Sequence, residues 1–313
     1  MRRVFLGGAT GVLVQNRRTV REAGKIFAYL CGVLGLGALL APPLYWGAHA
    51  LADAGVLVVL RKFAFQKYFN RAALVAAVAL LWPLVRWLGI RNWRPPAFRR
   101  DPAWARRLGV GFGLGAGAMV LLGGALWGGG AYRYVGLPGV GAIGTVMGSA
   151  VAVSLLEEAL FRGVLTGLFL RGMGPLGALG WTSGLFALVH FLKPDPAVRV
   201  GEVTWGSGFA LVPHAFHQFR EPLLFLGGFG TLLVLGWVLG LAAQRTGSLW
   251  MSIGFHGGLV LAKGVFLKAF GQASEIPPWV GPQLQIGLAP VCVLLLSGGV
   301  VWAWTRPGVA GSG

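Results

Sequence analysis

Two adjacent glutamates, Glu157 and Glu158, lie inside an apolar run from about 142 to 170. The chain has nine acidic residues, and the other seven fall in loops or at the ends of apolar runs. A charged side chain at the centre of a bilayer costs roughly 2.5 to 3.5 kcal/mol, so an acid at this depth needs a partner or a function. Arg162 is the expected partner of Glu158, because the two are four residues apart with the acid first, the favourable order on a helix.

Glu157 is left without a partner on this helix, and two interpretations are open. In the first, it belongs to a structural ion cluster that braces the helices. In the second, it is a general base, because a carboxylate in a low-dielectric cleft is a stronger base than in water and such groups concentrate at functional sites.

Two of the five histidines also lie at membrane depth. His190 ends the apolar run 175–192, and a hairpin centred near Met173 joins that run to the one that carries Glu157. At 1.5 Å per residue both side chains lie roughly 25 Å from the turn, so we expect them to face each other. His256 lies in the middle of the run 247–267, where an imidazole without a partner is poorly solvated.

One carboxylate and two histidines suit peptide hydrolysis. That reaction needs an activated water, a polarised carbonyl and a proton for the leaving amine, and these three groups can supply all of them. The same residues could hold a catalytic zinc ion with an open water position. Acids and histidines in membranes also form the proton relays of transporters.

The composition predicts the elements that position these groups. With 313 residues, 56% hydrophobic residues and a mean hydropathy of +0.71, the chain is expected to be an all-α, polytopic membrane protein with the site inside the helical bundle. About eight apolar runs are long enough to span a bilayer, near 26–46, 72–90, 109–129, 142–170, 175–192, 223–243, 247–267 and 283–304. No internal repeat is visible, which counts against transporter folds built from duplicated halves.

The net charge of +18 indicates topology rather than nucleic-acid binding. The basic residues are spread over loops and termini instead of gathering with stacking aromatics. A basic arm before the first run and the arginine loop 91–107 are both expected in the cytoplasm. This loop divides an N-terminal membrane region, 1–108, from a region 109–313 that contains the catalytic core at about 140–265. We expect the protein in a bacterial cytoplasmic membrane, with the lipid bilayer as its partner and no nucleic acid.

The 53 glycines predict close helix packing. Small residues four apart let helix backbones approach in membranes. Three such patterns stand out, at 109/113/117, at 144/148 and at 236/240.

Three ordered motifs are Glu157-Glu158-x-x-x-Arg162, Phe186-x-x-x-His190, and His256 in a glycine-flanked helix. Together they resemble the motifs of the CPBP intramembrane proteases, the family that contains the CAAX prenyl endopeptidases. The resemblance implies a glutamate-dependent endopeptidase without cofactor or metal, acting on a peptide or a membrane-anchored protein.

The resemblance also implies a role for each of these residues. Glu157 would activate water and His190 would help to hold it. Glu158 and Arg162 would brace the site, and His256 would stabilise the oxyanion.

One position departs from the family pattern. Four residues after His256 the family usually has Asn, and this chain has Val260. Loss of one oxyanion donor typically costs 10² to 10³ in rate. The donor could instead come from Ser252, one turn before His256, or the protein could be a non-catalytic relative that acts as a binding or immunity-type membrane protein.

Overall fold

The structure is a computed structural model that describes residues 8–56, 58–89 and 100–306. It is almost entirely helical, so the predicted all-α class is confirmed. Six helical stretches of the described chain are long and apolar enough to cross a membrane, and two shorter apolar helices, α6 and α10, accompany them. These eight elements occupy the eight apolar runs, and the protein is an integral multi-pass membrane protein. A backbone in lipid must satisfy its hydrogen bonds internally, which is why apolar runs of this length form helices.

The described residues divide into two compact units, and the domain division predicted from the sequence, at 108/109, stays a prediction. The first unit contains Met1–Trp93 and Leu192–Arg220, and the second contains Arg94–Phe191 and Glu221–Gly313. All residues proposed for the site, from Glu157 to Val260, belong to the second unit.

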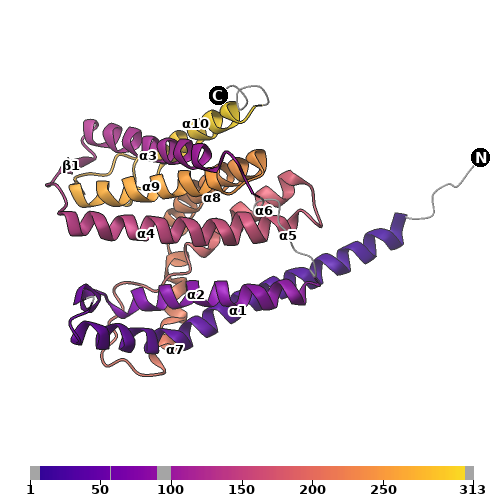
Figure 1. Ribbon diagram of the computed structural model, residues 1–313, viewed down its shortest axis with the longest axis horizontal. Helices are drawn as coiled ribbons and strands as arrows, with labels where there is room; N and C mark the ends of the chain where they lie inside the picture. Colours follow the sequence, from indigo (N-terminus) through magenta and orange to yellow (C-terminus); the bar gives the residue numbers. More distant parts are fainter. Residues whose placement is uncertain (1–7, 57, 90–99, 307–313) are drawn as a thin grey trace, which may run out of the picture. The chain divides into compact units, whose positions relative to one another are not determined.

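In the first unit, α1 (Gly8–Asp53) and α2 (Phe65–Trp87) form an antiparallel hairpin, joined through the short 3₁₀ helix η1 (Val58–Lys62) (Figure 1). The buried ring of Phe69 packs in a cluster with Ala38 and Leu211. Leu211 ends the short helix α7 (Ser207–Leu211), which the 3₁₀ helix η4 (Pro213–Arg220) follows.

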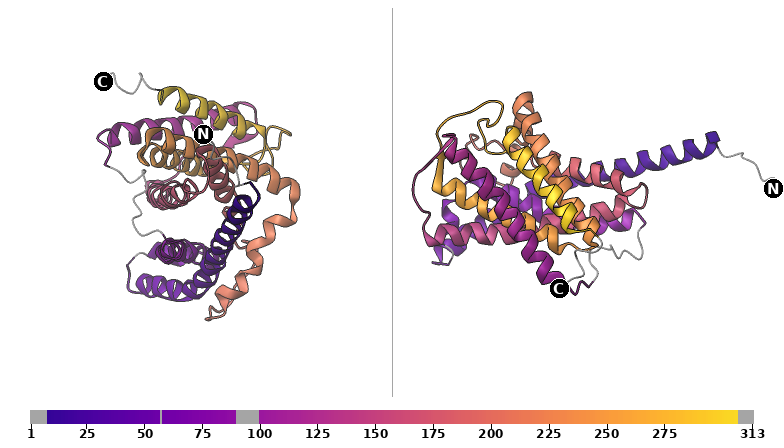
Figure 2. Two further views of the ribbon diagram at one scale, coloured as in Figure 1. Left: turned by 90° about the vertical axis from the view of Figure 1, so that its right-hand side faces the viewer. Right: turned by 90° about the horizontal axis from the view of Figure 1, so that it is seen from above.

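The second unit is built on three stacked helices. Helix α9 (Trp250–Ala269) lies between α3 (Trp104–Gly128) and α4 (Val140–Glu158), as Figure 1 shows. Helix α4 continues without a break through a π-helical turn, η3 (Ala159–Leu165), into α5 (Thr166–Phe169). After a short turn the chain returns antiparallel to α5 as α6 (Pro175–Val189), which packs against α8 (Pro222–Thr246). Helix α10 (Leu288–Trp304) packs on α8 and α3 (Figure 2).

Glycines bring α3 and α9 into backbone contact. A Cβ atom on Gly111 or Gly115 would lie about 2 Å from a carbonyl oxygen of α9, at 2.2 Å from Met251 and 2.0 Å from Phe255. Gly254 and Gly258 of α9 meet carbonyl oxygens of α3 in the same way. The predicted packing through the 109/113/117 and 144/148 patterns is wrong, because those five glycines have no neighbour within 4 Å of a Cβ position. The 236/240 pattern does pack, against Ser183 and Leu179 of α6.

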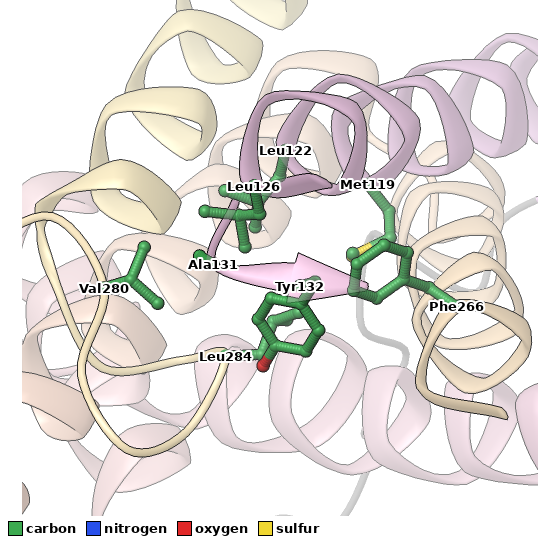
Figure 3. Packing of buried hydrophobic residues seen from close by; sticks show 8 residues of the cluster. All are labelled: Met119, Leu122, Leu126, Ala131, Tyr132, Phe266, Val280 and Leu284. Atoms are coloured by element: carbon green, nitrogen blue, oxygen red, sulfur yellow. The ribbon is translucent and has the colours of Figure 1, made fainter. Parts of the chain in front are cut away.

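A small apolar core closes one end of the second unit (Figure 3). Strand β1 (Tyr132–Tyr134) follows α3 and pairs antiparallel with β2 (Phe270–Gln272), which follows α9. Side chains from both helices, from β1 and from the loop before α10 pack together there: Met119, Leu122, Leu126, Ala131, Tyr132, Phe266, Val280 and Leu284. This core ties together the ends of α3 and α9 that lie far from the glutamates.

Candidate active site

The two glutamates end helix α4, and the chain then enters the π-helical turn η3. The wider turn is supported at its end by Thr166, whose hydroxyl donates to the carbonyl of Phe161 at 2.9 Å and lies 3.2 Å from the hydroxyl of Thr182 on α6. Single π-helical turns inside α-helices occur frequently at functional sites. Nothing in the residue types of this segment predicted the π-helical turn.

Glu158 and Arg162 form a fully buried ion pair. The Nη1 group of Arg162 donates to Oε1 of Glu158 at 2.9 Å, and neither side chain is exposed. The Nη2 group of Arg162 donates to the backbone carbonyl of Gly236 on α8 at 3.0 Å. Sequence reasoning missed this partner, because a backbone carbonyl leaves no signature in the residue type.

Phe186 is the ring around which the site is packed. It is completely buried on α6, and the guanidinium of Arg162 lies 4.4 Å from the centre of its ring. The ring centres of His190 and His256 lie 4.5 and 6.0 Å from it. A buried cation over an aromatic face is favourable, so Phe186 stabilises the arginine.

The hydrogen-bond partners assign one tautomer to each neutral histidine. Nδ1 of His190 lies 2.7 Å from the backbone carbonyl of Phe186, which can only accept, so Nδ1 carries the proton. Nδ1 of His256 lies 2.9 Å from Oε1 of Glu158 and donates to that carboxylate. In both rings this leaves Nε2 as the atom that faces the site.

Both Nε2 atoms converge on one oxygen of Glu157. Oε2 of Glu157 lies 3.6 Å from Nε2 of His190 and 3.9 Å from Nε2 of His256. These distances exceed those of a direct hydrogen bond, so neither imidazole nitrogen bonds directly to this oxygen. The side chains of Glu157 and His190 are 17% and 20% exposed, whereas that of His256 is 3% exposed. The site is therefore accessible from the side of Glu157 and His190 and closed behind His256.

Ser252 and Val260 lie one helical turn before and one helical turn after His256 on α9. Val260 is half-buried one turn after His256, on the face of α9 whose Gly257 and Gly264 meet Ser154 and Val146 of α4. Ser252 is completely buried, donates to the carbonyl of Leu249 at 2.9 Å, and lies beside the carboxylate of Glu158.

The depths of the three polar helices agree because the α5–α6 hairpin extends past the start of α9. Glu157 lies 12 residues before the end of α5, or ~18 Å along the axis, and His256 lies six residues after the start of α9, or ~9 Å. The two side chains nevertheless meet. Consequently the end of α5 lies about 9 Å, the difference between these two lengths and more than one helical turn, beyond the first residue of α9.

The turn that leads into α9 is anchored outside the apolar spans by Asp101. Its carboxylate accepts from Nη1 of Arg107 at 2.8 Å and from the backbone N–H of Ala103 at 3.0 Å, and Nη1 of Arg107 also donates to the carbonyl of Thr246 at 2.9 Å. Burial raises the pKa of Asp101, but hydrogen bonds from Ser248 and Ala103 and the charge of Arg107 outweigh it, so the pKa lies below its usual value. Gly247, in the left-handed conformation, ends α8 at this turn.

No set of three or more His, Cys, Asp or Glu side chains in the described part of the chain has the geometry of a metal site. Chemically, the site consists of a carboxylate and two imidazole nitrogens around one space, with a buried ion pair behind them. It can hold a water molecule and accept a proton from it.

The chain matches one protein-family model. Residues 139–262 match the family described as type II CAAX prenyl endopeptidase Rce1-like. The match covers less than half of the chain and includes Glu157, His190 and His256. No curated protein and no solved structure matches the chain significantly. The resemblance to the CPBP and CAAX proteases is thereby confirmed.

Proposed function

We propose that this chain is an intramembrane endopeptidase that hydrolyses peptide bonds of membrane-associated proteins or peptides. The match of residues 139–262 to the type II CAAX prenyl endopeptidase Rce1-like family supports this proposal. The observation that carries this proposal is the convergence of Nε2 of His190 and Nε2 of His256 on Oε2 of Glu157. Oε2 of Glu157 and Nε2 of His190 are acceptors that suit the two hydrogens of a water molecule, whose oxygen keeps a lone pair for attack.

In the proposed reaction, Glu157 accepts a proton from this water as the water oxygen attacks the peptide carbonyl carbon. The carbonyl oxygen becomes an oxyanion, and the proton on Glu157 then passes to the leaving nitrogen as the carbon–nitrogen bond breaks. His190 orients the water through Nε2, because the carbonyl of Phe186 fixes its ring.

His256 is the proposed donor to the oxyanion, and Glu158 orients its ring. To donate from Nε2 the ring must carry a proton on both nitrogens. The carboxylate of Glu158 accepts from Nδ1 at 2.9 Å and holds the ring in this orientation. Arg162 in turn fixes Glu158, so the ion pair orients the histidine and does not itself touch the substrate.

The site lies closer to the end of the second unit where α3 and α9 begin, next to the arginine loop 91–107, than to the β1–β2 end. His256 is ~9 Å from the start of α9, and β2 lies at the other end of that helix. Because arginine-rich loops stay in the cytoplasm, we propose that the site opens toward the cytoplasmic face of a bacterial cytoplasmic membrane.

Val260 supports a second candidate, a non-catalytic relative that binds a peptide without cleaving it. A valine cannot donate a hydrogen bond to an oxyanion. The same experiment separates the two candidates.

The experiment is digestion of a peptide library by purified protein in nanodiscs, with new peptide termini read by mass spectrometry. The wild type and the exposed-carboxylate control Glu275→Gln are expected to give the same cleavages, and Glu157→Gln is expected to give none. Cleavage that persists in Glu157→Gln would remove Glu157 as the base. Peptide binding without any cleavage by the wild type would favour the non-catalytic relative.

A further inference from the structure

Three exposed arginines, one on α3, one on α8 and one just after the end of α10, gather on tryptophans at one end of the second unit. The guanidinium of Arg306 lies 3.6 Å from the ring centre of Trp302, and that of Arg245 lies 5.7 Å from the same ring. Arg106, near the start of α3, lies 5.5 Å from the ring centre of Trp304. We call Arg106, Arg245 and Arg306 the arginine cluster.

The arginine cluster has no carboxylate partner among the residues that the structure describes. Arg245 donates through Nε to the hydroxyl of Thr305 at 2.7 Å and through Nη2 to the carbonyl of Thr305 at 3.4 Å. The only acid of the second unit known to lie at this end is Asp101, and it is already paired with Arg107. Each guanidinium has five N–H donors, so most donors of the cluster remain available to an anion.

The cluster lies where a bilayer meets water. Helices α3 and α9 begin at this end, with Trp104 and Trp250 in contact at 5.3 Å between ring centres, and α8 and α10 end there. Tryptophans at the ends of apolar helices are typical of the headgroup region. Two helix beginnings and two helix ends give dipoles that largely offset each other, so the arginines decide the sign of the charge.

An apolar stripe leads away from the cluster along α10. Leu295, Leu296 and Val300 are 58%, 66% and 49% exposed on this helix, and Trp302 is 43% exposed at its end. A ligand with an anionic head and long apolar chains would contact both features at once.

We propose that the arginine cluster is a binding site for the headgroup of an anionic phospholipid, with the phosphate held by the guanidinium groups and an acyl chain along α10. Arginine suits this ligand because its planar fork binds two phosphate oxygens together. The site is distinct from the glutamates and histidines, and its test does not depend on proteolysis.

The test compares two lipids that differ only in headgroup charge. Purified protein in detergent micelles is titrated with phosphatidylglycerol and with phosphatidylcholine of the same acyl chains, and bound lipid is counted by native mass spectrometry. Tighter binding of phosphatidylglycerol is expected. In Arg245→Gln/Arg306→Gln this binding should weaken roughly 25-fold, because each basic residue near an anionic headgroup contributes about a factor of five.

The matched control removes two charges from the opposite end of the same unit. Arg133 in β1 and Lys268 at the end of α9 are both exposed there, so Arg133→Gln/Lys268→Gln should leave the preference for phosphatidylglycerol unchanged. If the double variant at the cluster folds poorly, Arg106→Gln serves instead, because the contact of Arg106 within the described part of the chain is with the ring of Trp304. It should weaken binding about five-fold.

Three results of the lipid titrations would overturn the proposal. These are equal binding of the two lipids by the wild type, a preference that survives in both cluster variants, and a preference lost equally in the control variant. Inorganic phosphate distinguishes a lipid from a free anion as the ligand. Displacement of the lipid by inorganic phosphate at concentrations comparable to the lipid would show that the acyl chain contributes nothing and would also overturn it.

Discussion

The substitution Glu158→Gln tests whether the buried ion pair supports the site as described. Oε1 of Glu158 accepts at 2.9 Å from Arg162 and at 2.9 Å from His256, and all three side chains are 3% exposed or less. Glutamine keeps the shape and one accepting oxygen, but it leaves the charge of Arg162 without a carboxylate partner in the buried site.

The expected loss is about 3 kcal/mol of unfolding free energy. Removal of one partner from a buried pair typically costs 3 to 5 kcal/mol, and the remaining amide oxygen places this variant at the lower end. For a chain of 313 residues a loss of that magnitude lowers Tm by roughly 5 °C. Turnover should fall as well, because Nδ1 of His256 loses the charged acceptor that holds its ring in place.

The neighbouring substitution Glu157→Gln is the matched control. Oε2 of Glu157 has no direct hydrogen-bond partner in the described structure, so neutralising it breaks no hydrogen bond there. Its Tm should stay within about 2 °C of the wild type while cleavage is lost. The two adjacent glutamates are therefore expected to separate stability from activity.

A double variant, Glu158→Gln/Arg162→Met, completes the cycle in Tm measurements in one detergent. Because it removes the stranded charge, it should be more stable than the sum of the two single losses predicts. The reasoning is refuted if Glu158→Gln melts like the wild type, or if the two single losses simply add.

Three further predictions follow from the same geometry. If position 260 faces the developing oxyanion, Val260→Asn should raise kcat by about ten-fold or more, with a smaller effect on KM. A lower Tm with no faster turnover would show that the side chain only packs toward α4. Elemental analysis of purified protein should find no stoichiometric zinc, and one zinc per chain that disappears in His256→Ala would overturn the metal-free mechanism. Asp101→Asn should lower Tm at pH 7, and the difference in Tm between this variant and the wild type should narrow below about pH 4. A carboxyl group whose pKa is lowered by folding stabilises the protein above its unfolded pKa and loses that contribution as the pH falls through the folded pKa. A constant difference in Tm down to about pH 3 would contradict the role of this carboxylate.

The sequence was sufficient for those features that depend on hydropathy and on local spacing. The eight apolar runs became the eight apolar helices, because length and apolarity alone decide which segments suit a bilayer. The pairing of Glu158 with Arg162 followed from the i,i+4 spacing, which the π-helical turn does not disrupt. The depth match of Glu157 and His190 followed from the rise of two helices joined by one hairpin.

The features that sequence reasoning missed depend on which helix faces which. Glycine patterns pointed to 109/113/117 on α3, whereas the contact with α9 uses 111 and 115, and at this glycine content several registers look equally plausible. The contact between Nδ1 of His256 and Glu158 requires the position of α9 against α4, which no local pattern contains. The carbonyl of Gly236 as a partner of Arg162 is likewise a property of the tertiary fold.

The glycine contact between α3 and α9 has a mechanical consequence for the two histidines. Four glycines place the backbones of these helices against each other without intervening side chains, so no change of rotamer can let one helix slide past the other. His256 is thus carried by a helix that is held in place against α3. His190 instead directly follows the end of α6, whose contacts with α8 include the flexible side chain of Leu179. Any opening that admits a peptide should therefore come from movement of α6 and His190. Hydrogen exchange should accordingly be faster in α6 than in the first turns of α9.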